Sequence, residues 1–344
     1  MIVDDSALMR KLLVDIFAEE KEFEVCVACN SDDALAALHQ FQPHVISLDI
    51  NMPGKNGLEC LSRIMIERPT PVVMFSALTE SGTVATLEAM ALGAVDYMPK
   101  PEGAISLHLE QIARMLVWKV RVAAQAKIRK SLGLTQRLRE QNLNLVLPRP
   151  RNRHSRGVVI IGVSTGGPRT LEEILPQLPA DFPWPVIVAQ HMPANFTSAL
   201  TKRMAPLCQL EVVEVMQPVL LERGHIYIAR GETDAKLINR KNGIMVLPVP
   251  VNSDYSWHPN TDILVESAMK VFAPEQIIGV LLTGMGDDGA AAMTLLHAAG
   301  GRTIAEAKET AVIFGMPQAL IQKGGAEVVL RSDEIAGRLE LWLR

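Results

Sequence analysis

Short apolar runs alternate with amphipathic stretches along most of the chain, and this alternation restricts its fold more than any other feature. In the first half, residues 45–48, 72–75 and 95–98 are apolar runs, and residues 58–66 and 84–92 have helical spacing. Strands that alternate with helices are typical of a parallel sheet covered on both faces. About five such units fit before residue 120, which predicts a flavodoxin-like domain with a five-stranded parallel sheet.

A second domain of the same class is predicted from residue 157 onward. Its first run, GVVII, is continuous and β-branched, which is typical of a buried parallel strand. We expect hairpins between residues 211 and 246, further strands at 186–189, 277–282 and 327–330, and helices at 195–204, 262–272, 290–299 and 333–343. The predicted α/β architecture is therefore a flavodoxin-like domain over 1–120, a basic linker over 121–156, and a doubly wound, mostly parallel domain with a β-hairpin region over 157–344.

Charge is unevenly distributed in this chain of 344 residues. Its net charge is −4, but residues 114–156 hold twelve lysines or arginines and one acidic residue, so that segment carries +11 and the rest −15. A nucleic-acid arm and a docking surface for an acidic partner are alternatives to a solvated helix face with a linker. We favour the last, and expect no DNA partner, because no helix-turn-helix pattern accompanies the charge.

Two features of the sequence predict a cytoplasmic location without membrane insertion. No apolar run reaches the roughly 18 residues that a membrane helix needs, and no basic and apolar leader precedes Asp4. Cys26 and Cys29 form a lone C-x-x-C on a predicted strand, where their spacing directs the thiols to opposite faces. We expect buried or half-buried thiols in a reducing compartment rather than a metal or redox site.

Chemically active side chains follow the predicted strands of the first half. Asp4 and Asp5 follow the first strand, Asp49 the third, Ser76 the fourth and Lys100 the fifth. The carboxyl ends of parallel strands share one edge of a sheet, so these residues are expected to converge. Clustered carboxylates need a cation, and oxygen ligands favour Mg²⁺. A carboxylate beside Mg²⁺ and a lysine can attack a phosphoryl donor.

The first half resembles the receiver domain of bacterial response regulators over residues 1 to about 120, in its segments VDDSALMR, LDINMPGKNGLE, VVMFSA and DYMPKP. The resemblance implies that Asp49 is the phospho-acceptor and that a sensor histidine kinase of a chemotaxis-type pathway is a partner. It implies that Mg²⁺ is held by Asp4, Asp5, Asp49 and the backbone carbonyl of Asn51.

Further roles follow from the same resemblance. Ser76 and Lys100 would contact the phosphoryl oxygens, and Tyr97 would be the aromatic that reports the switch. The bond between Lys100 and Pro101 would be cis. The chain leaves room for about three residues of first strand before Asp4, which is short for a central strand.

The second half opens with the segment IIGVSTGGP, which fits either a phosphate cradle or a nucleophilic serine at a strand-to-helix turn. Ser164 stands where a dinucleotide site needs its second glycine, and no lysine follows Gly167 as in a P-loop. A nucleophile needs a base and an orienting acid. His191 ends a predicted strand, with His258 as its rival. The segment LLTGMGDDGA offers Asp287 and Asp288, between which spacing alone does not choose.

Together the segments IGVSTGGP, QHMPANFT, LLTGMGDDGA and FGMP resemble the catalytic domain of chemotaxis protein-glutamate methylesterases, the CheB family, over residues 157 to about 330. The resemblance selects Asp288 and implies the triad Ser164, His191 and Asp288. Methylated chemoreceptors would be the substrates and methanol a product, with glutamine deamidation as a second activity and no cofactor for the ester chemistry. The oxyanion candidates are the N–H groups of Thr165, Met285 and Gly286.

Two positions depart from the family pattern. Val163 stands where the family usually has alanine, and Trp257-His258-Pro259 replaces a loop that often reads H-R-P. For control, the hypothesis is that an unphosphorylated receiver covers the Ser164 edge and that phospho-Asp49 releases it. The alternative function is a response regulator whose second domain binds nucleotide or nucleic acid.

Overall fold

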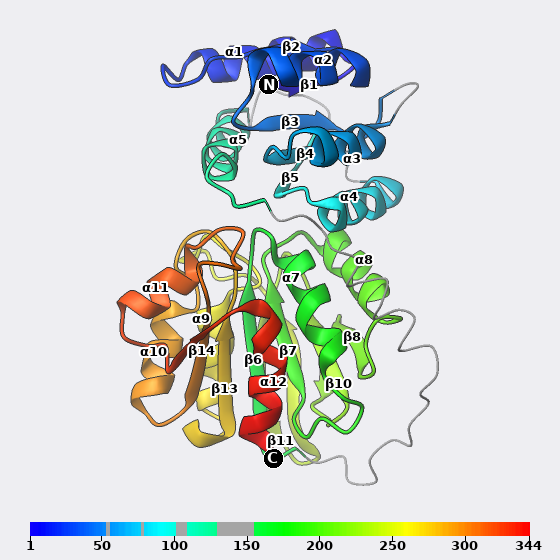
Figure 1. The fold of residues 1–344 in the computed structure, drawn as a ribbon. Coiled ribbons are helices and arrows are strands. Elements are labelled where there is room, and N and C mark those ends of the chain that lie inside the picture. Colours follow the sequence, from blue (N-terminus) through cyan, green and yellow to red (C-terminus); the bar gives the residue numbers. More distant parts are fainter. Residues whose placement is uncertain (53–55, 77–78, 101–108, 129–154) are drawn as a thin grey trace. The chain divides into compact units, whose positions relative to one another are not determined.

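The computed structural model describes residues 1–52, 56–76, 79–100, 109–128 and 155–344. The chain divides into two compact units, Met1–Leu132 and Gly133–Arg344, which are described separately (Figure 1). Most of the basic segment lies outside the described residues, so the predicted linker boundaries stay predictions. The bond between Lys100 and Pro101 lies outside them as well.

The first unit has a five-stranded parallel sheet, as the sequence predicts. Its order is β2-β1-β3-β4-β5, which is the order of a flavodoxin-like fold. The strands are β1 (Ile2–Val3), β2 (Val27–Ala28), β3 (Ile46–Asp49), β4 (Val72–Ser76) and β5 (Asp96–Pro99). The short β1 is buried and pairs with strands on both sides, because Ile2 aligns with Val27 and with Ser47.

Side-chain caps begin four of the helices of this unit. The hydroxyl of Ser6 accepts the N–H of Met9, and Asn30, Asn56 and Thr79 accept an N–H three residues ahead in the same way. Such caps satisfy one of the unpaired N–H groups at a helix start. The helices are α1 (Ala7–Ala18), α2 (Ser31–Phe41), α3 (Gly57–Glu67), α4 (Glu80–Leu92) and α5 (Leu109–Ala123).

The second unit is built on a seven-stranded parallel sheet in the order β15-β14-β13-β6-β7-β10-β8. From β6 the chain continues to β7 on one side and returns later to β13 on the other, so β6 marks the point where the winding reverses. Ligands in open α/β sheets bind at the carboxyl ends of strands beside such a point. The strands are β6 (Val158–Val163), β7 (Val186–Gln190), β8 (Glu211–Val215), β10 (His225–Ala229), β13 (Ile277–Leu281), β14 (Arg302–Glu306) and β15 (Val328–Leu330).

A three-stranded antiparallel sheet, β11-β12-β9, accompanies the main sheet. Here β11 (Asp234–Arg240) and β12 (Gly243–Val249) form the hairpin that the sequence predicts, and β9 (Val219–Leu220) pairs with β12. The hairpin prediction is wrong for residues 211–229, because β8 and β10 pair in parallel inside the main sheet. Alternating apolar residues suit either pairing. Strand β10 takes the buried place between β7 and β8 and pairs in parallel with both.

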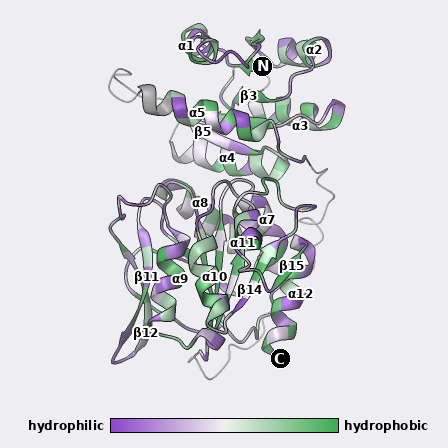
Figure 2. Cartoon of the chain, turned by 90° about the vertical axis from the view of Figure 1, so that its left-hand side faces the viewer, coloured by the Kyte–Doolittle hydropathy of each residue, from purple (hydrophilic) through white to green (hydrophobic). Residues whose placement is uncertain are grey.

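Helices cover both faces of the main sheet, as a doubly wound fold requires. On one face, α10 (Ala290–Ala298) contacts both α9 (Thr261–Met269) and α11 (Met316–Gln322), and on the other α7 (Gly167–Ile174) contacts α12 (Ser332–Leu343) (Figure 1). Helix α8 (Ala194–Met204) packs against β8 and β10. Figure 2 shows hydrophobic and hydrophilic residues side by side on α9 and α12, as expected for helices with one buried face. In the described part of the chain, no helix is long and apolar enough to cross a membrane.

Candidate functional site

The three residues proposed as a catalytic triad follow adjacent strands of the main sheet. Ser164 follows β6, His191 follows β7, and Asp288 lies in the turn between β13 and α10. Backbone hydrogen bonds join these strand ends, since the N–H of Ser164 donates to the carbonyl of Thr283 at 2.9 Å and that of His191 to Val163 at 3.1 Å. The winding reversal at β6 therefore brings the three chain segments together.

Asp288 is surrounded by hydrogen-bond donors. Its carboxylate lies 2.7 Å from Nε2 of His191 and accepts the side-chain amide of Asn260 at 2.7 Å. It also accepts the N–H groups of Thr261 and Asp262, at 2.8 and 3.2 Å. Burial by itself would raise the pKa of Asp288, but these donors outweigh burial and the pKa lies below its ordinary value. Asp288 is thus built to remain an anion.

This pairing decides which nitrogen of His191 is available. A carboxylate can only accept, so Nε2 of His191 carries the proton that faces Asp288. Nδ1 is buried and has no hydrogen-bond partner among the described residues. Ser164 is 8% exposed and, within these same residues, makes no hydrogen bond to His191. Nδ1 therefore keeps a lone pair for a proton, and a serine–histidine contact is one that often tightens only when substrate binds.

His258, the rival base, is occupied elsewhere. Its Nδ1 lies 2.8 Å from the carboxylate of Asp234, and its Nε2 lies 3.1 Å from the carbonyl of Tyr255. Both ring nitrogens thus face acceptor atoms, so neither is left to take a proton from a serine. The geometry favours His191 as the base.

The glycine-rich turn after β13 lies directly against Ser164. A Cβ on Gly284 would come within 2.7 Å of the Cβ of Ser164, so only glycine permits this approach. Gly286 has φ +78°, a left-handed conformation that glycine adopts without strain. Thr165 is tied to the same turn, because the hydroxyl of Thr283 donates to its carbonyl at 2.9 Å. Met285 and Gly286 follow Gly284 in this turn, and their oxyanion role stays a prediction.

Val163 is fully buried at the end of β6. Its Cγ2 lies 2.7 Å from the place that a Cβ on Gly167 would occupy. The extra bulk relative to alanine is therefore accommodated against the start of α7, next to a glycine.

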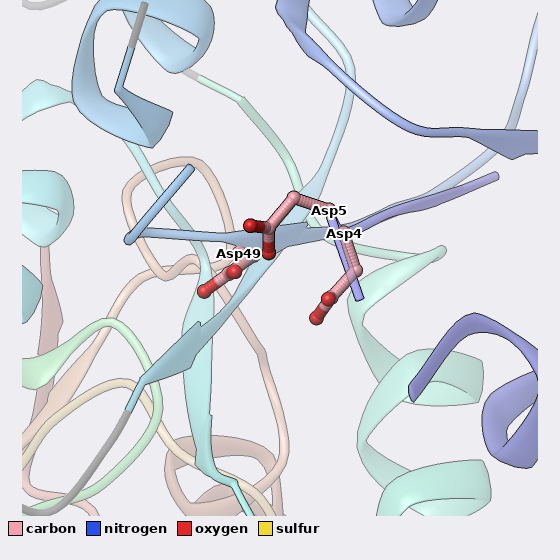
Figure 3. Close-up of side chains that lie close together, drawn as sticks. All are labelled: Asp4, Asp5 and Asp49. Carbon is pink, nitrogen blue, oxygen red and sulfur yellow. The ribbon is translucent and has the colours of Figure 1, made fainter. Parts of the chain in front are cut away.

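A second candidate site lies at the carboxyl edge of the first sheet. Ligand atoms of Asp4, Asp5 and Asp49 all lie within 4.8 Å of one another (Figure 3). The ammonium of Lys100 lies 2.9 Å from Asp4 and 2.8 Å from Asp49. Burial raises the pKa of Asp49, although Lys100 and the N–H of Asn51 partly offset it. Burial would lower the pKa of Lys100, but the two ion pairs outweigh it and raise that pKa.

The structure describes three further residues that the sequence predicts for the phosphorylation site. The N–H of Asn51 donates to Asp49 at 3.1 Å. Ser76 ends β4, and its hydroxyl donates to the carbonyl of Gly82 at 3.1 Å. Tyr97 is buried in β5, with the ammonium of Lys119 5.3 Å from its ring. Three closely spaced carboxylates form a hard oxygen donor set, so the residues fit Mg²⁺.

The cysteine prediction needs one correction. Cys26 is half-buried as expected, but Cys29 is exposed. Strand β2 ends at Ala28, so Cys29 lies in the following loop, where its thiol donates to Asp33 at 2.8 Å.

Sequence reasoning did not find the residues that support the triad. Asn260 precedes a helix and is a recognisable N-cap, whose oxygen accepts the N–H of Ile263 at 2.8 Å. Its second contact, to Asp288, joins positions 28 residues apart and leaves no local signal. Trp257 stacks on His191 with ring centroids 5.8 Å apart and planes 12° apart, and this contact has no sequence signal either.

Comparison with known proteins agrees with this architecture. The family model for the response regulator receiver domain matches residues 1–111, and the model for the CheB methylesterase matches residues 159–339. A protein-glutamate methylesterase/protein-glutamine glutaminase from Rhodospirillum rubrum is 52% identical over 353 residues, covering 100% of this chain and 95% of the relative. A relative of the same description from Carboxydothermus hydrogenoformans is 42% identical, covering 98% and 97% of the two chains.

A solved structure is similar as well. The crystal structure of the CheB methylesterase catalytic domain of Thermotoga maritima is 37% identical, with a TM-score of 0.53. The match covers 55% of this chain and 100% of that domain. The family models, the full-length relatives and this structure lead to one conclusion: the chain belongs to the CheB methylesterase family.

Proposed function

We propose that this chain is a protein-glutamate methylesterase in which Ser164 is the nucleophile, His191 the general base and Asp288 the residue that orients the base. The observation that carries the proposal is the hydrogen bond of 2.7 Å between Nε2 of His191 and Asp288, at the sheet edge where Ser164 lies. It leaves the buried Nδ1 as the nitrogen that can accept a proton.

The first half of the reaction forms an acyl-enzyme. The hydroxyl oxygen of Ser164 attacks the carbonyl carbon of a γ-glutamyl methyl ester, and its proton passes to Nδ1 of His191. Asp288 stabilises the resulting imidazolium without taking its proton. Backbone N–H groups of Thr165, Met285 and Gly286 face the oxyanion, which collapses as methoxide leaves and takes the proton from His191 as methanol.

Water completes the reaction at the same residues. His191 removes a proton from water, the resulting hydroxide attacks the acyl carbon, and the proton returns to the departing oxygen of Ser164. The products are a glutamate carboxylate and free enzyme. A glutamine side chain that enters the same pocket would release ammonia in place of methanol, which is the second activity that the relatives' description names.

The receiver supplies control in this proposal. Asp49 attacks a phosphoryl donor, and Ser76 and Lys100 contact the transferred group, while Tyr97 responds to it. Asp4, Asp5, Asp49 and the carbonyl of Asn51 would hold Mg²⁺, which neutralises charge on the phosphoryl oxygens. Phosphorylation of Asp49 is proposed to increase ester hydrolysis in the second unit.

The remaining parts of the proposal concern partners. A sensor histidine kinase of a chemotaxis-type pathway would donate the phosphoryl group, and methylated chemoreceptors in the cytoplasm would be the substrates. The full-length match to methylesterase/glutaminase relatives, together with the receiver model over residues 1–111, supports both.

Methanol release from methylated receptors, with and without a small phosphoryl donor, tests the proposal. Wild-type protein should release methanol, and the donor should increase the rate. Ser164→Ala should reduce turnover by about 10⁴-fold or more, with an unchanged thermal unfolding midpoint. Asp49→Asn should keep the basal rate and lose the response to the donor. A near-normal rate in Ser164→Ala would falsify the assignment of the nucleophile.

A further inference from the structure

A loop from a different part of the fold covers the proposed base. Residues 252–260 connect the small antiparallel sheet to α9, and Trp257 in this loop stacks on the ring of His191. The ring centroids are 5.8 Å apart and the planes differ by 12°, so the two rings are stacked rather than edge to face. Trp257 also approaches the turn beside the nucleophile, since its Nε1 lies 3.4 Å from the place that a Cβ on Gly286 would occupy.

Asp234 holds this loop in place. It begins β11, is 1% exposed, and accepts hydrogen bonds from both ends of the loop. The donors are the N–H of Asn252 at 3.0 Å, Nδ1 of His258 at 2.8 Å and the N–H of Asn260 at 2.8 Å. A buried carboxylate with three donors is a rigid anchor, so the position of Trp257 is built into the fold.

We propose that Trp257 is a positioning residue for His191, whose aromatic face orients the imidazole and stabilises the imidazolium that forms when Ser164 gives up its proton. This inference rests on the proposed function, because it assigns a role to Trp257 only if His191 is the base. An aromatic ring attracts a cation within about 6 Å of its centroid, and indole does so best. The attraction exists only in the charged state of His191, so it favours the transition state over the resting enzyme.

Other titratable groups lie near His191, and their effect on the pH profile must be distinguished from the effect of Trp257. Asp288 bonds directly to His191, and Asp262 donates its N–H to Asp288. Asp262 matters most, because burial and the charge of Asp288 raise its pKa to about 6. Tyr255 interacts with Asp262 and Asp288, and Asp287 lies exposed beside Asp288. The experiment therefore uses Asp262→Asn as its background, so that Asp262 contributes no titration.

The first measurement is the pH profile of methanol release by Trp257→Leu and Trp257→Phe in that background. Loss of the aromatic face in Trp257→Leu should lower kcat by about 3- to 30-fold with little change in KM. The acidic limb of the profile should move to lower pH, since the imidazolium is less stable. Trp257→Phe, which keeps an aromatic face, should recover most of both effects. If Trp257 only packs against its neighbours, Trp257→Leu should leave the acidic limb of the pH profile unchanged, and Trp257→Phe would have no shift to reverse.

The second measurement does not depend on activity. A protonated imidazole stacked on an indole quenches its fluorescence, so the protein in the Asp262→Asn background should lose emission as the pH falls through the acidic limb. The loss should be absent in Trp257→Phe, which keeps the other three tryptophans, and in His191→Gln.

The outcomes separate this inference from the proposed function. If Trp257→Leu keeps the wild-type kcat and acidic limb while Ser164→Ala is inactive, Trp257 has no role and the triad stands. The same conclusion follows if the fluorescence change persists in Trp257→Phe. If Ser164→Ala is active, the proposed function itself fails.

Discussion

The acid pocket of the first unit and the proposed triad of the second unit lie at corresponding places in two α/β folds. They differ in the direction in which the surroundings shift the pKa of the central aspartate. Each lies at the carboxyl edge of a parallel sheet, beside the strand where the winding reverses. Asp49 shares its pocket with Asp4 and Asp5, and burial raises its pKa. Asp288 receives donors from His191, Asn260, Thr261 and Asp262, and its pKa is lowered.

The comparison teaches that the donors around a carboxylate, more than its place in the sheet, decide its chemistry. Among the described residues, Asp49 accepts the N–H of Asn51 and pairs with the ammonium of Lys100. Asp288 has its oxygens occupied by four donors, so it serves as a fixed anion. In the proposed function, Asp49 forms a bond to the phosphoryl group and Asp288 orients the ring of His191.

The largest effect is expected from substituting the proposed base, which should change the reaction at one site and not at the other. His191→Gln removes the proton acceptor, so ester hydrolysis should fall by about 10⁴-fold. Phosphoryl incorporation at Asp49 should be unchanged, because that chemistry uses the other sheet. Methanol release and radiolabelled phosphate incorporation are measured on the same preparation. Reduced phosphorylation in this variant would contradict the assignment of the two reactions to separate sets of residues.

A smaller effect is expected when one donor to Asp288 is removed. Asn260→Ala should lower kcat/KM by about tenfold, the value of one hydrogen bond to a charged group. It should also lower the free energy of unfolding by about 1 kcal/mol, because the cap of α9 is lost. Asn260→Ser is the matched control, since serine caps a helix but is too short to donate to Asp288. Asn260→Ser should restore the urea midpoint and leave kcat/KM low. If it restores both, Asn260 acts only as the cap of α9 and not through Asp288.

In the acid pocket, Lys100 is the residue to vary. Lys100→Met removes the cation between Asp4 and Asp49. The pKa of Asp49 should rise further, and phosphoryl incorporation from a small donor should fall by about tenfold at neutral pH. Lys100→Arg keeps the charge and should retain more incorporation. Equal incorporation in all three proteins would show that Lys100 does not act on the phosphoryl group.

The smallest expected effect is a pH dependence of stability from Asp262. Its folded-state pKa of about 6 lies above the ordinary value of 3.8, so the folded state binds the proton more tightly. The free energy of unfolding should therefore decrease as the pH rises from about 4 to 6, by on the order of 1 kcal/mol after solvent screening. Asp262→Asn should abolish this decrease in urea titrations across that range. An increase in stability over the same range that depends on Asp262 would contradict the sign.

The fold and the placement of the main site residues could be predicted from sequence because both depend on strand ends. Apolar runs locate β3, β4, β6 and β7, and parallel pairing then puts the residue after each strand at a common edge. Pairing partners are a tertiary property, so β8 and β10 were expected as hairpin strands. Strand β14 was not predicted, since its residues Arg302–Glu306 form neither an apolar run nor a polar–apolar alternation.

The supporting contacts could not be predicted for a related reason. Asp234 reaches Asn260 across 26 residues, and Asn260 reaches Asp288 across 28. Such contacts exist only after β11, the loop and α9 have packed. Nor does any sequence pattern determine which nitrogen of His191 faces Asp288, although this choice decides where the proton goes.

The most direct test of the contrast between the two aspartates is one pair of isosteric substitutions with two readouts. Asp49→Asn and Asp288→Asn are each assayed for phosphoryl incorporation and for methanol release without a donor. We predict that Asp49→Asn loses incorporation and keeps basal hydrolysis. Asp288→Asn should keep incorporation and lose hydrolysis by about 10⁴-fold. Near-normal hydrolysis in Asp288→Asn, or normal incorporation in Asp49→Asn, would contradict the division of roles.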